Sequence, residues 1–393
     1  MIPTISAFDR IGEENAFAVL ARAQALAASG RSVINLGIGQ PDFQTPSHIV
    51  EAGIKALKDG HHGYTDARGI PAVREGVARY TEQRTGVAVS ADNVLIVPGG
   101  KVTMFTAILM FGEPGVEILY PDPGFPIYRS MIEFTGATPV PIPITEENGF
   151  TFKAYDVLAR ITGKTRLIIL NSPANPTGGV TPKAEIDALV AGLEAHPTVT
   201  ILSDEIYERM TYSEDGPADT HVSLLTYPSI RDRLIVLNGW SKTWAMTGWR
   251  MGWSIWPDDL YEKARKLAVN CWSCVNAPAQ WAGLAALEGP QNDVDTMMAA
   301  FANRRTRVVD GLNALPGISC IMPEGAFYAF PNIKQTGFKA KDLASQLLEE
   351  TGVALIGGPD FGVLGEGYIR VSYAASQEQI KEALERMTAF LDG

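Results

Sequence analysis

A lysine inside an almost uncharged aromatic segment is the side chain of this sequence best suited to covalent chemistry. Lys242 follows an apolar run that ends at Asn238, and three tryptophans lie between positions 240 and 249. Removal from water lowers the pKa of a lysine, so that its free amine becomes a nucleophile nearer neutral pH. Arg250, eight residues later, carries a guanidinium that can bind a phosphate through two hydrogen bonds. An ordinary surface lysine is the simpler interpretation, but such lysines rarely lie among tryptophans.

Two carboxylates follow another apolar run, Val199–Leu202. Asp204 and Glu205 close this run, and Tyr207 comes shortly after them. A buried carboxylate needs a nearby cation, because otherwise its pKa rises and it becomes neutral. A protonated pyridine nitrogen is one such cation. A helix cap at Asp204, with Tyr207 in the core, explains the same residues equally well.

Two loops rich in glycine, proline and asparagine complete the set of candidate sites. Gly99, Gly100 and Lys101 follow the apolar run Val94–Val97 and open a predicted helix. Glycines let the backbone approach an anion, and a helix start offers free N–H groups. The second loop, 171–179, contains Asn175 and must turn sharply. Taken alone, each loop is also explained as a tight turn that leads into a helix.

The four clusters each follow a short apolar run, and this arrangement predicts the fold that positions them. Runs ending at Val97, Tyr120, Asn171, Asp204 and Asn238 lead into loops, and most are followed by a helical pattern. Such alternation is typical of an α/β fold with a doubly wound, mostly parallel sheet. Ligands of these sheets bind at the carboxyl ends of the strands, where the four clusters lie.

The 393 residues exceed what one hydrophobic core usually fills, so two domains are expected. We predict a large domain over 47–289 and a smaller α+β domain formed by 1–46 together with 290–393. In the smaller domain the patterns predict strands and helices as follows: a helix at 16–29, strands at 318–331, 353–357 and 368–373, and helices at 339–350 and 377–391.

Composition and charge narrow the classes of function. The net charge of -11 opposes binding to nucleic acid or to an anionic membrane. Positions 1–10 lack the pattern of a signal peptide, and the most apolar run, 103–112, is too short to span a bilayer. Three cysteines are too few for a disulfide framework, which predicts a reducing cytoplasm. Cys271 and Cys274 match a C-x-x-C motif, but neither a thioredoxin-like setting nor further zinc ligands accompany them.

The four clusters together resemble a known enzyme family. The segment S-K-T-W-A-M-T-G-W-R-M-G, which contains Lys242 and Arg250, resembles the cofactor-binding signature of fold-type-I, class I/II aminotransferases. The other clusters stand in that family's order and spacing, and the resemblance extends from 39–43 to 368–370. It is nearest to the bacterial aspartate-aminotransferase-like branch. It implies a seven-stranded sheet, pyridoxal 5'-phosphate as the cofactor, and a homodimer with active sites at the subunit interface.

The resemblance also implies a role for each candidate residue toward the cofactor. Lys242 would form the Schiff base and then move the substrate's α-proton as base and acid, and Asp204 would pair with the pyridine N–H. Tyr207 and Asn175 would hydrogen-bond the ring's phenolic oxygen, and Phe125 would stack on the ring.

The phosphate would bind the loop Gly99-Gly100-Lys101, Arg250, and Tyr64 of a second subunit. Many relatives have a serine where this chain has Gly239, so Ser241 is a possible substitute. Cis peptide bonds are implied at Asp122-Pro123 and Asn175-Pro176.

For the substrate, the resemblance assigns Arg370 to the α-carboxylate, with help from Asn175 and the Gly39 backbone. A lysine at the position of Lys101 binds the distal carboxylate in aspartate-specific relatives, which favours aspartate as donor and 2-oxoglutarate as acceptor. Glu14 would repel a dicarboxylate unless it faces solvent. The segment 267–280 lacks the arginine that better-known relatives supply, and Trp272 lies near that place. An aromatic or broad range of donors therefore stays open.

Three other functions remain as alternatives. A carbon–sulfur β-lyase could use the same cofactor and fold. A regulator built on this fold would carry a basic DNA-binding region, and the chain has no spare segment for one. A nicotinamide-dependent dehydrogenase is the most distant, because Asp42 stands where the third glycine of a dinucleotide fingerprint that begins at Gly37 belongs.

Overall fold

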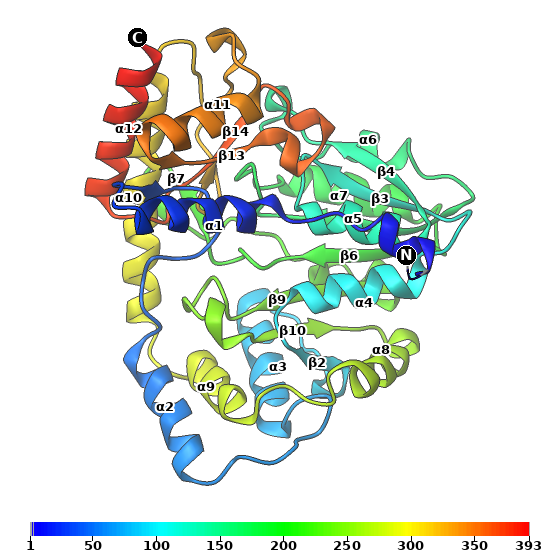
Figure 1. The fold of residues 1–393 in the computed structure, drawn as a ribbon. Helices are drawn as coiled ribbons and strands as arrows, with labels where there is room; N and C mark the ends of the chain where they lie inside the picture. The colour runs from blue at the N-terminus through cyan, green and yellow to red at the C-terminus, as the bar shows by residue number, and fades with distance from the viewer. Residues whose placement is uncertain (1, 3, 393) are drawn as a thin grey trace.

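The computed structural model describes residues 2 and 4–392, and a seven-stranded sheet forms its centre (Figure 1). β10 runs antiparallel to both of its neighbours, and the other strands pair in parallel. The predicted α/β class with a mostly parallel sheet is therefore confirmed. In spatial order the strands are β2 (Val94–Val97), β10 (Gly252–Ile255), β9 (Leu234–Gly239), β6 (Thr200–Asp204), β5 (Thr165–Asn171), β3 (Glu117–Asp122) and β4 (Thr138–Pro143).

The five apolar runs all form strands of this sheet, three of them ending at the predicted residue. β3 and β9 continue to Asp122 and Gly239, slightly beyond the predicted ends. Two strands were not predicted. β4 contains three prolines and pairs only with β3, which agrees with the rule that proline is confined to edge strands. β10 begins at Gly252, two residues after Arg250, and the sequence analysis assigned this stretch to the cofactor-binding motif and not to a strand.

Several helices of the large unit connect one strand of the sheet to the next along the chain, and the loop at the end of the first strand leads into the helix. α4 begins at Lys101 after β2, and α5 begins after the loop that follows β3. α2 and α9 pack side by side, away from the C-terminal helices (Figure 1). The helices are α2 (Ser47–Lys58), α3 (Pro71–Thr85), α4 (Lys101–Phe111), α5 (Pro126–Thr135), α6 (Ala154–Leu158), α7 (Lys183–Leu193), α8 (Asp258–Cys271) and α9 (Ala277–Glu288). A hairpin of β7 (Thr211–Ser213) and β8 (Gly216–Ala218) lies after β6.

The N-terminal segment joins the C-terminal part of the chain. β1 (Ile34–Asn35) pairs in parallel with β12 (Val353–Ala354), and a second small sheet has the order β11-β14-β13. Helix α1 lies between these strands and the large sheet in Figure 1. This arrangement is compatible with the proposed division into 47–289 and 1–46 plus 290–393. The elements are α1 (Asn15–Ala28), α10 (Asn292–Asn313), α11 (Ala340–Gln346), α12 (Gln377–Leu391), β11 (Tyr328–Ala329), β13 (Ile356–Gly357) and β14 (Ile369–Ser372).

The predicted strand at 318–331 is wrong over most of its length. Only β11 is a strand there, because Pro323 interrupts the run and Gly325 packs so tightly that a side chain would collide with Pro173 and Val180. The predicted strand 353–357 is two strands, β12 and β13, which belong to different sheets. The predicted helix 339–350 is α11 followed by a π-helical turn, Leu347–Thr351.

The predicted helix 377–391 is confirmed as α12, which begins at a capping box formed by Ser376 and Gln379. The predicted helix 16–29 is α1, shifted by one residue.

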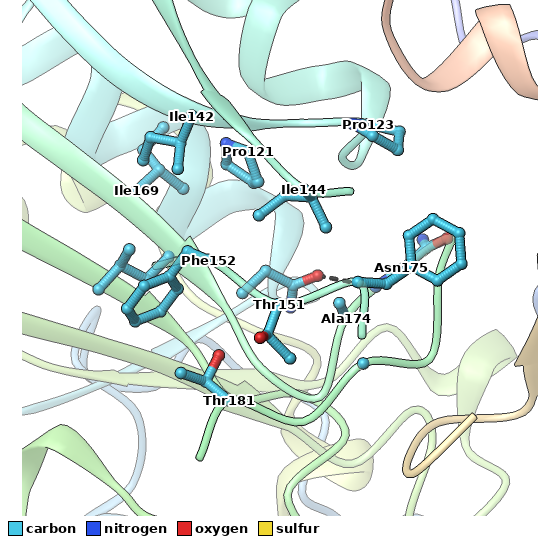
Figure 2. Close-up of a pocket in the computed structure, with 14 residues that line it drawn as sticks. Pro121, Pro123, Ile142, Ile144, Thr151, Phe152, Ile169, Ala174, Asn175 and Thr181 are labelled. Carbon is cyan, nitrogen blue, oxygen red and sulfur yellow. Dashed lines mark hydrogen bonds between the residues drawn. The ribbon is translucent and has the colours of Figure 1, made fainter. Parts of the chain in front are cut away.

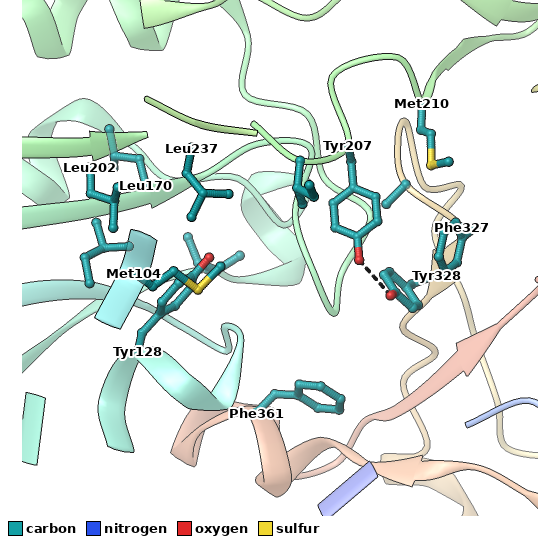
Figure 3. Close-up of a cluster of buried hydrophobic side chains, with 14 of the residues drawn as sticks. Met104, Tyr128, Leu170, Leu202, Tyr207, Met210, Leu237, Phe327, Tyr328 and Phe361 are labelled. Atoms are coloured by element: carbon teal, nitrogen blue, oxygen red, sulfur yellow. Dashed lines mark hydrogen bonds between the residues drawn. The ribbon is translucent and has the colours of Figure 1, made fainter. Parts of the chain in front are cut away.

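A continuous core connects the large sheet with the C-terminal unit. Figure 3 shows Leu170, Leu202 and Leu237 from the central strands on one side, Tyr207 with Phe327 and Tyr328 on the other, and Phe361 of the C-terminal unit below them. Side chains that reach the strand ends are therefore held by packing on both sides. Of the helices described, none is both long and apolar enough to cross a membrane.

Candidate active site

A cavity of about 440 Å³ lies at the carboxyl ends of the central strands. The N-terminal segment, the strand-end loops and the C-terminal unit all contribute to its wall. Its volume lies in the range of small-molecule sites. The predicted site residues that line it are Gly39, Gly100, Lys101, Phe125, Asn175, Asp204, Tyr207, Ser241, Lys242, Arg250 and Arg370. Gly99 and Tyr64 are the two predicted residues that do not.

Lys242 lies in the loop that follows β9, where two buried indoles, Trp240 and Trp244, fix the backbone around it. Its Nζ donates a hydrogen bond to the Gly39 carbonyl at 2.6 Å. Burial, with a smaller contribution from the positive charge of Arg370, lowers the pKa of Lys242 to about 8. The pKa of the amine thus lies much nearer neutral pH than that of a lysine in water, as the aromatic segment predicted.

Asp204 is the last residue of β6 and is almost fully buried. Tyr128 donates a hydrogen bond to its Oδ2 at 2.6 Å, and the backbone N–H of Ile206 donates to its Oδ1. Burial raises the pKa of Asp204 to about 6. Among the ion pairs found in the described chain, none involves this carboxylate. A ligand with a cationic N–H would satisfy it.

Tyr128 was not predicted as a site residue. It lies three residues after Phe125, near the start of α5, so both side chains lie on the same side of the helix. Their rings meet edge to face at 5.8 Å. That spacing was the available signal, but a tyrosine in an apolar helix looks like an ordinary core residue.

An anion-binding cradle lies at the start of α4. Gly100 is the N-cap residue, no side chain caps it, and Gly100 and Lys101 both line the cavity, so the start of this helix is suited to an anion. Gly99 has φ +93°, and a side chain there would collide with the Arg250 guanidinium. Glycine is thus required for Arg250 to lie against this loop. Together with Ser241, these groups fit a phosphate, and with Asp204 they fit pyridoxal phosphate.

Arg370 comes from β14 and reaches the cavity from the C-terminal unit. Its Nη1 donates to the side-chain oxygen of Asn175 at 2.9 Å, and its Nη2 donates to the Gly37 carbonyl. The guanidinium lies 4.6 Å from the Tyr328 ring and 4.7 Å from the Phe361 ring. Its Nε is buried without a hydrogen-bond partner among the described residues. A carboxylate would satisfy this fixed, buried cation.

The loop that presents Asn175 is fixed by its own side chains. Asn171 accepts a hydrogen bond from the Asn175 N–H at 2.9 Å, beside a cavity too small for a ligand (Figure 2). Cis peptide bonds occur at Asp122-Pro123 and Asn175-Pro176, as predicted, and also at Ser172-Pro173.

On the facing side of the cavity, the hydroxyls of Tyr207 and Tyr328 lie 2.8 Å apart (Figure 3). Tyr328 was not predicted, because it lies in the segment wrongly expected to be a long strand.

Lys101 does not project into the cavity as a free cation. Its Nζ donates to Glu14 at 2.7 Å and lies 5.3 Å from the Phe125 ring and 5.7 Å from the Phe17 ring. Glu14 therefore faces the cavity and not the solvent.

Tyr64 and Trp272 both lie away from the cavity of this single chain. Tyr64 is 93% exposed, so a contact with the cofactor would have to be made by a second subunit. The indole N–H of Trp272 is buried without a partner in the described chain. Cys271 and Cys274, beside it, are free thiols.

Behind Asp204 lies a buried polar network that sequence analysis missed. His221 shares a hydrogen bond of 3.2 Å with Glu205, which also accepts from Ser203. Glu208 accepts from Tyr80 nearby. Burial opposes protonation of His221, but the hydrogen bond and charge of Glu205 outweigh it and raise the pKa of His221. The same pair lowers the pKa of Glu205 in spite of its burial.

We predict that His221→Gln destabilises the protein by about 2–4 kcal/mol at pH 6 and by less at pH 9. The folded-state pKa of His221 is raised, so its charged contribution is complete below the unfolded value and fades as pH rises through the folded value. Urea unfolding at both pH values measures the difference. His62→Gln, at an exposed histidine, is the control. An equal loss at both pH values would assign the effect to packing.

Comparisons with known proteins agree with these features. A family model described as aminotransferase class I and II matches residues 31–387. The chain is 40% identical to the putative aminotransferase YugH of Bacillus subtilis, over 93% of each chain. It is 36% identical to an aspartate aminotransferase of Geobacillus stearothermophilus, over 95% of each. The crystal structure of the aspartate aminotransferase from Rhizobium meliloti superposes with a TM-score of 0.93 at 33% identity, covering 100% of this chain and 99% of that one.

Proposed function

The chain belongs to the class I and II aminotransferases, which depend on pyridoxal phosphate, and we propose that it moves the amino group of aspartate to a 2-oxo acid such as 2-oxoglutarate. One observation carries the choice of donor. Lys101 and Arg370 line the same cavity as Lys242, and these two cations suit the two carboxylates of aspartate when the substrate replaces Glu14 at Lys101. The relatives named as aspartate aminotransferases support it. A β-lyase is not favoured, because the relatives are named as aminotransferases.

We assign the cofactor to the residues that fit it. Pyridoxal phosphate supplies an aldehyde that bonds to an amine and a cationic ring that withdraws electrons from the substrate's α-carbon. Asp204 would hold the ring nitrogen, and Phe125 would lie against the ring. The N–H groups of Gly100 and Lys101, with Arg250, Gly99 and Ser241, would hold the phosphate. Tyr207 and Asn175 would hydrogen-bond the ring oxygen.

The chain's own groups then account for the proton transfer. Arg370 would bind the α-carboxylate, helped by Asn175 and the Gly39 backbone, and so place the α-carbon near Lys242. With a pKa near 8, the Lys242 amine can accept the α-proton and return it. Arg370 and Lys242 lie in different parts of the chain, so that substrate binding would draw these parts together and expel water.

The assembly and location are also proposals. We propose a homodimer in which Tyr64 of each subunit completes the phosphate site of the other. The full exposure of Tyr64 in the single chain supports this assignment. The three free cysteines support a reducing location such as the cytoplasm.

The function is tested by a half-reaction without any 2-oxo acid. We expect aspartate to convert the bound cofactor to its amine form, followed by near-visible absorption, more efficiently than phenylalanine, because Lys101 binds the second carboxylate once the Glu14 side chain rotates away from it. Faster conversion by phenylalanine would refute aspartate as donor and leave the family activity intact. Release of ammonia without conversion of the cofactor would indicate lyase chemistry instead.

A further inference from the structure

We propose that Glu14 is a specificity-determining residue that competes with the distal carboxylate of a substrate for Lys101. This inference rests on the proposed function, because it concerns the same side-chain subsite. The side-chain subsite is the part of the cavity around Lys101, where the side chain of the substrate would bind. There the Glu14 carboxylate is already paired with the Lys101 ammonium, which is the group that the distal carboxylate of a substrate would bind. Aspartate must therefore displace the Glu14 carboxylate, whereas an uncharged donor leaves it in place.

The backbone position of Glu14 makes its contact with Lys101 informative. Glu14 is the N-cap residue of α1, a position usually held by Ser, Thr, Asp or Asn. Its side chain makes no capping hydrogen bond and reaches Lys101 at 2.7 Å. The side chain of Glu14 is 19% exposed, against 42% for Lys101. The carboxylate of Glu14 is therefore directed to the ion pair in the cavity and not to the start of its own helix.

A charge inventory of the cavity shows why this pair controls the side-chain subsite. Four cationic side chains line the cavity in the described chain, and three of them have another task in the proposed reaction. Lys101 is left for a substrate side chain. The acidic lining residues are Asp204 and Glu14, and Asp204 is assigned to the cofactor ring.

With Glu14 in place, the side-chain subsite is electrically neutral. Its other walls include the rings of Phe17 and Phe125, which lie against the Lys101 ammonium. A second carboxylate entering this subsite would meet two negative charges on a single ammonium, which is unfavourable. An apolar side chain meets no such penalty.

The segment that carries Glu14 is fixed on both sides, so Glu14 cannot leave simply by drifting away. Before it, Arg10 donates to the Glu133 carbonyl at 2.8 Å, and the Gly12 N–H donates to Ser130 at 2.9 Å, both on α5. After it, Asn15 donates to Asp360 at 2.7 Å. Competition for Lys101 must therefore be resolved by rotation of the Glu14 side chain, with the backbone in place.

The test compares Glu14→Gln with Glu13→Gln, which removes the same charge from the exposed neighbouring residue. The holoenzymes are titrated with succinate, an unreactive dicarboxylate, and assayed with aspartate and phenylalanine. We expect succinate to bind Glu14→Gln at least about tenfold more tightly than the wild type, with a matching fall in the KM for aspartate. The KM for phenylalanine should change by less than about twofold, and Glu13→Gln should resemble the wild type in every assay.

Unchanged or weaker succinate binding by Glu14→Gln would overturn the inference. A second comparison places Glu14→Gln in a Lys101→Met background, where its effect on succinate should disappear. If the effect persists there, Glu14 acts by some means other than Lys101, and the inference is also overturned. If phenylalanine outperforms aspartate in every variant while succinate still tightens, aspartate fails as donor and the assignment of Glu14 stands.

Discussion

Lys242→Ala is expected to lower the rate of half-transamination by at least about ten-thousandfold. The change removes both the amine that bonds to the cofactor and the base that moves the α-proton. Borohydride reduction followed by peptide mass spectrometry should find the cofactor fixed at Lys242 in the wild type and at no lysine in the variant. Lys381→Ala, at an exposed lysine of α12, should resemble the wild type.

The variant also separates chemistry from folding. Asp204, Arg250 and the start of α4 remain, so we expect Lys242→Ala to bind the cofactor non-covalently. A variant that neither folds nor binds the cofactor would make the activity loss uninformative, so circular dichroism and a cofactor titration accompany the assay. Residual turnover within tenfold of the wild type would refute the assignment of Lys242.

The pKa of Lys242 gives the same prediction a pH dependence. Burial lowers this pKa to about 8, so the nucleophilic amine is mostly protonated below pH 8 and mostly free above it. The rate at which the apoprotein captures pyridoxal phosphate should rise with pH and level off above about 8. A rise that continues toward pH 10.5 would mean that the amine is not desolvated in solution.

Much of the candidate site could be predicted from the sequence, because ligands of doubly wound sheets bind at the carboxyl ends of the strands. Lys242 and Asp204 both follow apolar runs, and parallel strands bring the ends of such runs to one edge of a sheet. Arg370 was predicted by family resemblance alone, because nothing in a local pattern shows that β14 reaches the cavity.

Other features depend on contacts that no local pattern contains. The direction of Glu14 is set by anchors on α5 and at Asp360, far away along the chain. Tyr128 looks like a core residue until its hydroxyl is seen to reach Asp204. β4 was missed because its prolines are tolerated only at a sheet edge, and its edge position is a property of the whole sheet.

Arg370→Lys is expected to weaken the binding of amino acids by about a hundredfold and to leave the binding of pyridoxal phosphate unchanged. Lysine keeps the charge but loses the planar fork that holds a carboxylate with two hydrogen bonds, each to a charged group and each worth about 1.5–3 kcal/mol. The residues around Arg370 contact the planar guanidinium in a way that an ammonium group cannot reproduce. Asn175 and Gly37 hold one edge of the guanidinium, and aromatic rings lie close to it.

The half-saturation concentration of aspartate and the cofactor Kd of the apoprotein measure the two effects separately. Arg386→Lys, at an arginine of α12 outside the cavity, is the matched control and should change neither value. An equal loss of amino-acid and cofactor binding would place Arg370 at the cofactor and refute its assignment to the α-carboxylate. A selective loss of amino-acid affinity would instead show that the C-terminal unit supplies the substrate site while the large sheet holds the cofactor. This division of labour is what allows substrate binding to close the cavity around Lys242.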